Sequence, residues 1–308
     1  MPCLGGREAE YVTECIQTGW VSSVGPFVER FEQEMAAGCG TRHAVAATSG
    51  TAALHLALMA LGIGPEDEVL VSDLTFVAPV NAIRYVGAHP VLVDSEPRHW
   101  QMDMARVETF LREECDRSAA GLVNRGSGRR VRALLPVHVL GHPVDVTALR
   151  RLADEHGLSV IEDCAEALGA RSAGRSVGTF GDVGCFSFNG NKTFTTGGGG
   201  MLITDDADLA ARARHLSTQA KDDPVEYLHA EVGYNYRLTN VLAAIGCAQL
   251  EQAAQFLAAK QRIATRYQDR LHAVPGFRFP ELAPDVCSSN WLCSVKIDAA
   301  VAGSRRAN

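Results

Sequence analysis

The sequence predicts an α/β fold with a mainly parallel central sheet covered by helices on both faces. Short β-rich runs alternate with segments in which apolar residues recur at helical spacing. Such alternation is typical of parallel strands joined by helical crossovers. The chain has 308 residues, of which 46% are hydrophobic, so it can bury a large core and is long enough for two subdomains.

Five strand and helix pairs are expected in order along the chain. In the first, the β-rich residues 43–49 precede an apolar segment at 50–62, where Leu54, Leu58 and Leu61 share a helix face. The other four pairs are 68–73 with 76–88, 89–95 with 104–114, 132–139 with 145–157, and 158–164 with 165–170. Between the third and fourth pairs, residues 121–130 read as an exposed loop.

The later part of the chain changes pattern. The apolar runs 181–190 and 199–206 are separated only by a loop, which predicts antiparallel neighbours. Helical spacing then dominates at 209–217 and over the long segment 240–274. A stretch with Pro and Gly at 275–285 indicates entry into a second domain, and 291–298 reads as a strand.

We expect three parts in this chain. Residues 1–25 form an N-terminal segment that packs with the small domain, and residues 26–250 form the large domain. Residues 251–308 begin a smaller C-terminal α/β domain that is expected to be truncated, because few elements follow its first strand.

Charge and cysteine usage exclude several classes of protein. The net charge is -7 and the basic residues form no tract, so we expect no nucleic-acid partner. The nine cysteines are odd in number and none stand as C-x-x-C, which predicts neither a disulfide framework nor a metal site. No apolar run has the length of a membrane span or a signal sequence, so we expect a cytoplasmic protein with no membrane partner.

Polar residues at the carboxyl ends of the expected strands are candidate ligand contacts, because open α/β sheets bind ligands at that edge. Ser49, Gly50 and Thr51 stand at a helix N-terminus, which attracts phosphate, and an ordinary helix cap explains them equally well. Asp163 ends a buried strand, where a carboxylate holds a cationic ring nitrogen or caps a helix. Phe76 follows another strand end and either stacks on a flat ligand or joins the core.

Lys192 lies in the loop between the two antiparallel runs, and four consecutive glycines follow it at 197–200. A loop lysine is ordinarily solvated, but a glycine run costs backbone entropy and is favoured where the chain turns tightly beside a ligand. With the phosphate cup, the strand-end carboxylate and the aromatic ring, this lysine matches the needs of pyridoxal phosphate (PLP). A neutral lysine amine bonds to the aldehyde, the carboxylate keeps the ring nitrogen protonated, and the released lysine moves a proton between carbons.

At these motifs the sequence resembles the nucleotide-sugar aminotransferases of the DegT/StrS type, a branch of the fold-type I PLP enzymes. The resemblance runs almost from end to end. It is carried by "GWVSSVGPFVERFE" (19–32), "TSGTAALHLAL" (48–58), "DLTFVAPVNAI" (73–83), "VHVLGHPVD" (137–145), "VIEDCAEALGA" (160–170), "GTFGDVGCFSFNGNKTFTTGGGGML" (178–202) and "EVGYNYRLTNVLAAIGCAQLE" (231–251). "GWVSSVG" and "SFNGNK" with "TTGGGGM" are similar to the subgroup that acts on UDP-linked 4-keto-6-deoxy-N-acetylhexosamines, as in legionaminic acid or bacillosamine pathways.

Carried over position by position, the resemblance implies specific roles. Lys192 becomes the lysine that bonds to PLP, Asp163 the partner of the ring nitrogen, and Phe76 the stacking ring. The implied phosphate contacts are Gly50, Thr51, Ala52, Ser187 and, from the neighbouring subunit, Asn235. Glu166 stands where many relatives carry Gln or His near the ring hydroxyl. The resemblance thus implies a homodimer with shared active sites.

Three further residues are candidates for substrate contact. His138 and His142 follow a strand end and are expected near the rim of the site. Arg237 offers a guanidinium for the donor's carboxylate or the substrate's diphosphate, and an ion pair at the subunit interface is the alternative.

The resemblance implies transfer of an amino group from L-glutamate to C4 of a UDP-linked 4-keto-6-deoxy-N-acetylhexosamine. Two alternatives stay open: another nucleotide-linked keto-sugar, dTDP- or GDP-linked, and a non-catalytic PLP-fold protein whose small domain is incomplete. A nicotinamide-binding dehydrogenase is disfavoured, because the glycine run follows a late strand and lacks the G-x-G-x-x-G spacing.

Overall fold

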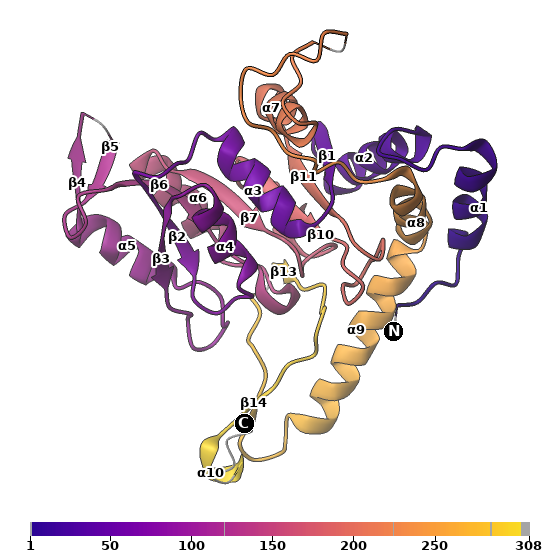
Figure 1. Ribbon diagram of the computed structural model, residues 1–308. Helices are drawn as coiled ribbons and strands as arrows, with labels where there is room; N and C mark the ends of the chain where they lie inside the picture. The colour runs from indigo at the N-terminus through magenta and orange to yellow at the C-terminus, as the bar shows by residue number, and fades with distance from the viewer. Residues whose placement is uncertain (1, 120, 224, 284, 303–308) are drawn as a thin grey trace.

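The computed structural model of the protein describes residues 2–119, 121–223, 225–283 and 285–302. Its centre is a nine-stranded sheet in which seven strands follow the order β1-β11-β10-β7-β6-β2-β3, while β4 and β5 attach through β6 (Figure 1). The strands are β1 His43–Ala47, β2 Asp67–Ser72, β3 His89–Val93, β4 Cys115–Ser118, β5 Gly121–Asn124, β6 Arg130–Leu135, β7 Ser159–Asp163, β10 Val183–Ser187 and β11 Gly200–Thr204.

Most neighbouring strands of this sheet run parallel. The strands β10, β7, β6, β2 and β3 run parallel to one another, whereas β11 is antiparallel to both β1 and β10. In the β10 and β11 pair, Gly184 faces Ile203 and Ser187 faces Gly200. The expected α/β fold and the expected antiparallel pair are therefore confirmed.

Helices cover both faces of the sheet (Figure 1). One face packs against α3, α4 and α7, and the other packs against α1, α2 and α8 at one end and α5 and α6 at the other. The bounds are α1 Glu8–Thr18, α2 Pro26–Cys39, α3 Gly50–Ala60, α4 Ala78–Tyr85, α5 Met104–Glu113, α6 Val146–His156, α7 Ala207–Ser217, α8 Asn240–Glu251 and α9 Ala253–Leu271. Strand β1 shows the alternation, because Ala44 and Ala46 join one core and Val45 and Ala47 join the other.

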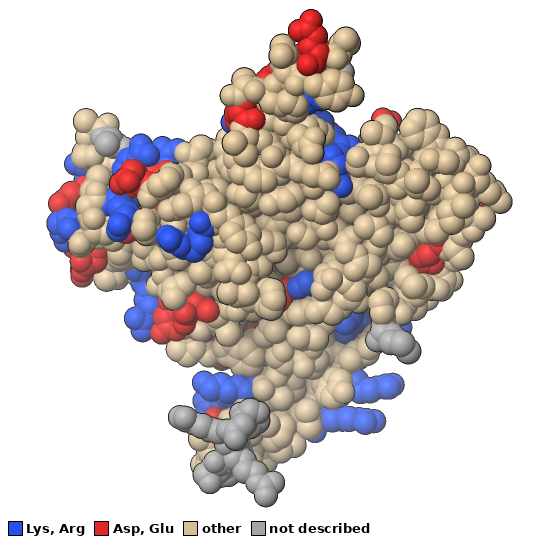
Figure 2. Space-filling view, in the orientation of Figure 1, with Lys and Arg blue, Asp and Glu red and all other residues tan. Residues whose placement is uncertain are grey.

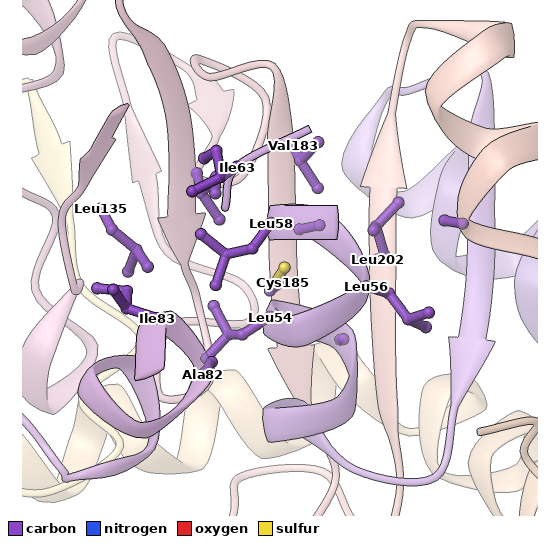
Figure 3. Packing of buried hydrophobic residues seen from close by; sticks show 14 of the residues in the cluster. Leu54, Leu56, Leu58, Ile63, Ala82, Ile83, Leu135, Val183, Cys185 and Leu202 are labelled. Carbon is purple, nitrogen blue, oxygen red and sulfur yellow. The ribbon is translucent and has the colours of Figure 1, made fainter. Parts of the chain in front are cut away.

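Helix α3 anchors the core beside the future site. Ser49 caps its N-terminus, where the side-chain Oγ accepts a hydrogen bond from Ala52 N at 3.0 Å. Leu54 and Leu58 lie close to Cys185 of β10, and Leu56 lies beside Leu202 of β11 (Figure 3). The packing fixes the first turn of α3 next to the end of β10.

Three local expectations are wrong. Residues 121–124 form strand β5 and pair with β4, because Leu122 is buried on the inner side of the hairpin. Residues 165–170 form turns rather than a helix, since Asp163 Oδ1 accepts from Ala165 N at 2.9 Å and Gly169 has a φ of 90°. The long segment 240–274 breaks at Gln252 into α8 and α9, which are bent by 62°.

The chain after α9 forms smaller elements. Strand β12 (Phe277–Arg278) pairs with β14 (Lys296–Ile297), so only two residues of the segment expected as a strand at 291–298 form one. Strand β13 (Val286–Cys287) joins β8 (Arg171–Ser172) and β9 (Arg175–Ser176). The last described element is α10 (Ala299–Ala302).

The division into three parts stays a prediction. Helix α1 packs on α8, where Tyr11 donates to Glu251 at 2.6 Å, and Gln252 at the start of α9 donates to Glu8 at 3.0 Å. Among the described residues, no single helix has both the length and the apolar character of a membrane span. Helices α8 and α9 have that length and character only when they are counted as one segment, and they are bent relative to each other.

Candidate active site

A cavity of about 400 Å³ lies where β7 and β10 end, beside the N-terminus of α3. This is the sheet edge at which open α/β folds bind ligands. The predicted site residues that line the cavity are Gly50, Thr51, Phe76, Asp163, Glu166, Ser187 and Lys192. Motifs from two distant parts of the sequence, residues 50–76 and residues 163–192, thus meet in one place.

The N-terminus of α3 forms one wall of the cavity. Two backbone amides in the first turn of α3 donate to Ser49: Ala52 N to the side-chain Oγ, and Ala53 N to the carbonyl oxygen at 3.0 Å. The amides of Gly50 and Thr51 therefore have no acceptor within the helix. A Cβ at Gly50 would lie 2.7 Å from Ser187 Cβ, so only glycine lets α3 approach β10 this closely. The helix dipole and the free amides make this wall an anion site.

Asp163 ends β7 and supplies a buried carboxyl group to the cavity. It is 4% exposed, and its Oδ1 accepts from Ala165 N at 2.9 Å. Burial raises the pKa of Asp163 to about 6, against the lowering effects of the Ala165 amide and the Lys192 charge. A cation placed beside this carboxyl group would favour its charged form.

Lys192 and Glu166 form the third part of the site. Lys192 lies in a turn after β10, and its Nζ is 3.5 Å from Glu166 Oε1. The other carboxylate oxygen of Glu166 accepts from Leu140 N at 2.7 Å. Leu140 has a φ of 61°, so a strained turn presents this amide to Glu166.

Phe76 lies in the loop before α4, and 72% of its surface is exposed. It lines the cavity instead of joining the core, although burial preferences favour the core for an aromatic residue. An exposed ring on a cavity wall suits stacking on a flat ligand.

The expected position of the two histidines at the rim is not observed. His138 is fully buried, with Nε2 2.9 Å from Glu162 Oε2 and Nδ1 accepting from Val144 N at 3.1 Å. Both ring nitrogens are engaged, so His138 offers nothing to a substrate. His142 is also buried, beside a separate cavity of about 360 Å³, and burial lowers its pKa to about 4.

The buried group of His138, Glu162 and Cys164 does not suit a metal ion. These three side chains offer ligand atoms within 4.8 Å of one another. However, Glu162 already accepts hydrogen bonds from the amides of Gly178, Phe180 and Gly181. The carboxylate is therefore satisfied by the fold.

Three other predicted residues do not line the cavity of their own chain. Ala52 has its amide bonded to the Ser49 cap. Asn235 is exposed, and Arg237 is half-buried near Glu32 and Arg214, where burial lowers its pKa. Their roles stay predictions, and the predicted role of Asn235 involves the neighbouring subunit.

Trp291 is a cavity residue that the sequence did not single out. Its indole lines the same cavity, and Lys192 Nζ lies 4.2 Å from the ring centroid. The segment around it showed only a strand-like pattern, and nothing local indicates contact with a lysine about one hundred positions earlier.

The residues present fit PLP. The free amides of α3 would hold its phosphate, Phe76 would face its ring, and Asp163 would pair with its ring nitrogen. Lys192 is within the same cavity and would bond to its aldehyde.

Comparison with known proteins agrees with this chemistry. The model of the DegT/DnrJ/EryC1/StrS aminotransferase family matches residues 2–307. The chain is 46% identical over 270 residues to GDP-perosamine synthase of Caulobacter vibrioides, covering 88% of this chain and 68% of that protein. It is 41% identical over 298 residues to the putative pyridoxal phosphate-dependent aminotransferase EpsN of Bacillus subtilis, covering 96% and 74%.

A solved structure shares the fold over most of the chain. S. venezuelae DesV in complex with a ketimine intermediate superposes with a TM-score of 0.85 at 37% identity, covering 94% of this chain and 74% of that chain. The chain therefore belongs to the DegT/DnrJ/EryC1/StrS aminotransferase family, whose members use pyridoxal phosphate.

Proposed function

We propose that this aminotransferase moves an amino group from L-glutamate to the keto group of a nucleotide-linked 6-deoxyhexose, with Lys192 as the residue that bonds to PLP. One observation carries the proposal. A single cavity joins the Lys192 amine, the buried carboxyl group of Asp163 and the anion-binding start of α3. Each of these serves a different part of the same cofactor.

The chain's own residues supply binding and proton transfer. When bound, PLP supplies the aldehyde and the electron sink. The α3 amides hold the phosphate, and Asp163 in its charged form keeps the ring nitrogen protonated. Lys192 Nζ, once released, accepts a proton from the donor's α-carbon in the first half-reaction and gives a proton to the acceptor carbon in the second. Glu166, 3.5 Å away, holds the lysine while its amine is charged.

The favoured acceptor substrate is a GDP-linked 4-keto-6-deoxy sugar. The relative at 46% identity is named for a GDP-linked product, whereas relatives at 41% and 40% identity are named for UDP- and dTDP-linked sugars. The UDP-linked 4-keto-6-deoxy-N-acetylhexosamine expected from "GWVSSVG" and "SFNGNK" is the second candidate. Turnover of GDP-, UDP- and dTDP-linked keto-sugars, measured as kcat/KM with L-glutamate, decides between them.

The first experiment tests the lysine. The chain has four lysines, Lys192, Lys221, Lys260 and Lys296, so borohydride reduction of the PLP-loaded protein and peptide mapping give a clear answer. We expect the reduced cofactor on Lys192, a yellow wild-type protein, and loss of that band on adding L-glutamate. Lys192→Ala is expected to abolish the band, and Lys221→Ala, whose residue is outside the cavity, to retain it. Label on another lysine would refute the proposal.

We also propose that a second copy of this chain completes the site. Figure 2 shows that the face over α3, α4 and α8 carries few charged side chains. Large apolar residues near the cavity are exposed there: Leu74 at 44%, Phe76 at 72%, Val77 at 54% and Tyr85 at 58%. An exposed apolar surface of this kind is typical of an interface between subunits. Sedimentation of the purified chain should give a dimer, and a monomer would contradict this proposal.

A further inference from the structure

The segment Ser288–Trp291, here called the clamp segment, follows β13 and brings Trp291 to the cavity. Ser288, Ser289 and Asn290 are 5%, 2% and 8% exposed. Ser288 Oγ and Ser289 N both donate to Gly141 O, at 2.8 and 3.0 Å. Gly141 has a φ of 89°, and a Cβ there would clash with Ser289 Oγ. This side of the site therefore depends on residues that come far later in the sequence.

The clamp segment touches both members of the Lys192 and Glu166 pair. Ser289 Oγ donates to Glu166 O at 3.0 Å. Trp291 Nε1 donates to Asn191 O at 2.8 Å, next to the lysine, and the Lys192 Nζ lies 4.2 Å from the centre of the indole ring. The amine is thus held between the Glu166 carboxylate and an aromatic face, two groups that attract a cation.

Helix α9 holds the clamp segment in place from the other side. Lys260 Nζ donates to Trp291 O at 2.9 Å, and Asn290 Nδ2 donates to Gln261 Oε1 at 2.8 Å. Asn290 has a φ of 50°, a conformation that asparagine tolerates better than most residues. Because the backbone of Trp291 is fixed in this way, its ring has a defined position over the lysine.

We propose that Trp291 is a positioning residue that orders the Lys192 amine before it reacts with PLP. Immobilising a free lysine side chain is among the largest side-chain entropy costs in proteins. Contacts with the ring and with Glu166 restrict this side chain before PLP binds, so less entropy is lost in the reaction. In the reaction, the charged amine first gives one proton to the Glu166 carboxylate 3.5 Å away. The neutral Lys192 Nζ then attacks the aldehyde carbon, a C=N bond forms, and the aldehyde oxygen leaves as water with the two remaining amine hydrogens. An ordered amine makes this condensation faster. The proposal rests on the proposed role of Lys192.

The test compares Trp291→Leu, which removes the aromatic ring, with Trp291→Phe, which keeps a ring. Trp100→Phe is the matched control, because Trp100 does not line the cavity. The rate at which the yellow band appears after mixing with PLP is measured for each. We expect the rate to fall roughly 5- to 30-fold in Trp291→Leu and about threefold or less in Trp291→Phe, from the size of a cation–π contact and one hydrogen bond. Trp100→Phe should match the wild type.

Binding of a second ligand shows whether slower condensation in Trp291→Leu comes from lost positioning of Lys192 or from a damaged cavity. Pyridoxamine 5'-phosphate has the same ring and phosphate but no aldehyde, so it cannot bond to the lysine. Its affinity, measured by calorimetry, should be unchanged within about twofold in Trp291→Leu if the cavity remains intact. Weaker binding of this ligand, in step with the slower condensation, would overturn the positioning role.

The outcomes also separate this proposal from the proposed function. If wild-type protein gives no yellow band with PLP, the role of Lys192 fails first. If the wild type gives the band and Trp291→Leu gives it as fast or faster, only the role of Trp291 is refuted. Equal slowing in Trp291→Leu and Trp291→Phe would assign the effect to the Asn191 hydrogen bond and overturn the role of the ring.

Discussion

His138 Nε2 lies 2.9 Å from Glu162 Oε2, and neither side chain has any exposed surface. Val144 N donates to the other ring nitrogen of His138, so the ring proton lies on Nε2 and is donated to the carboxylate. Burial acts to raise the pKa of Glu162, but the His138 bond and the backbone donors outweigh it and hold the pKa below its usual value. The pair fixes the end of β7 from behind the cavity.

We therefore predict that Glu162→Ala is strongly destabilising. It leaves the His138 Nε2 proton and three backbone N–H groups without their acceptor, a loss of about 3–5 kcal/mol in the free energy of unfolding. Urea unfolding of the apo protein measures it. Glu113→Ala is the control. Glu113 is exposed and, among the residues that the structure describes, pairs only with Arg112, so its loss should cost less than about 1 kcal/mol. Equal effects of the two substitutions would contradict this role.

Asp163→Asn should stabilise the apo protein at neutral pH while abolishing amino transfer. The folded pKa of Asp163 is raised from 3.8 to about 6 by burial, so the folded state binds its proton more tightly than the unfolded state does. The stabilising effect of the proton is complete below pH 3.8 and is lost as the pH rises through 6. A shift of this size corresponds to about 3 kcal/mol, and asparagine removes the penalty.

The measurement for Asp163→Asn is the free energy of unfolding at pH 4, 6 and 8 for both proteins without PLP. The advantage of the variant should be absent near pH 4 and rise towards about 3 kcal/mol at pH 8. An advantage that does not change with pH would show that titration of Asp163 is not its cause. After both proteins are loaded with PLP, the glutamate half-reaction should be lost in the variant, because a neutral amide cannot keep the ring nitrogen protonated.

Gly50→Ala should damage the phosphate wall. Its Cβ would lie 2.7 Å from Ser187 Cβ, so α3 or β10 must move, at a cost of about 1–3 kcal/mol in stability and at least tenfold in PLP affinity. Gly38→Ala is the matched control. Gly38 lies within α2 with open space around its Cβ position, so alanine there should be neutral or stabilising by up to about 1 kcal/mol. Normal PLP affinity in Gly50→Ala would refute this reading of the helix start.

The sequence predicted the parts of the site that local pattern determines. Asp163 and Lys192 could be placed because each follows an apolar run, and strand ends meet at one edge of a parallel sheet. His138 was misplaced because a position near a strand end does not say which way a side chain points. The Leu140 amide and Trp291 were missed because their contacts with Glu166 and Lys192 depend on chain segments that meet only after folding.

The exposed position of Asn235 leads to a test of shared sites by mixing two inactive proteins. Asn235 does not line the cavity of its own chain, and we propose that it reaches the phosphate in the partner subunit. Lys192→Ala and Asn235→Ala should each be inactive or nearly so. A mixed dimer contains one site with both defects and one site with neither, since Lys192 and Asn235 of an intact site then come from different chains.

Unfolding and refolding an equal mixture should therefore restore activity. Random pairing makes half of the dimers mixed, and each mixed dimer has one working site of two, so about one quarter of the wild-type activity is expected. Refolding each variant alone gives the baseline. The matched control mixes Lys192→Ala with Asp163→Asn, two residues that line the same cavity of one chain. Unlike the first mixture, this control should show no activity above the baseline, because each site of its mixed dimers keeps one defect. Absence of recovery in the first mixture, with mixed dimers verified by mass spectrometry, would place Asn235 outside the shared site.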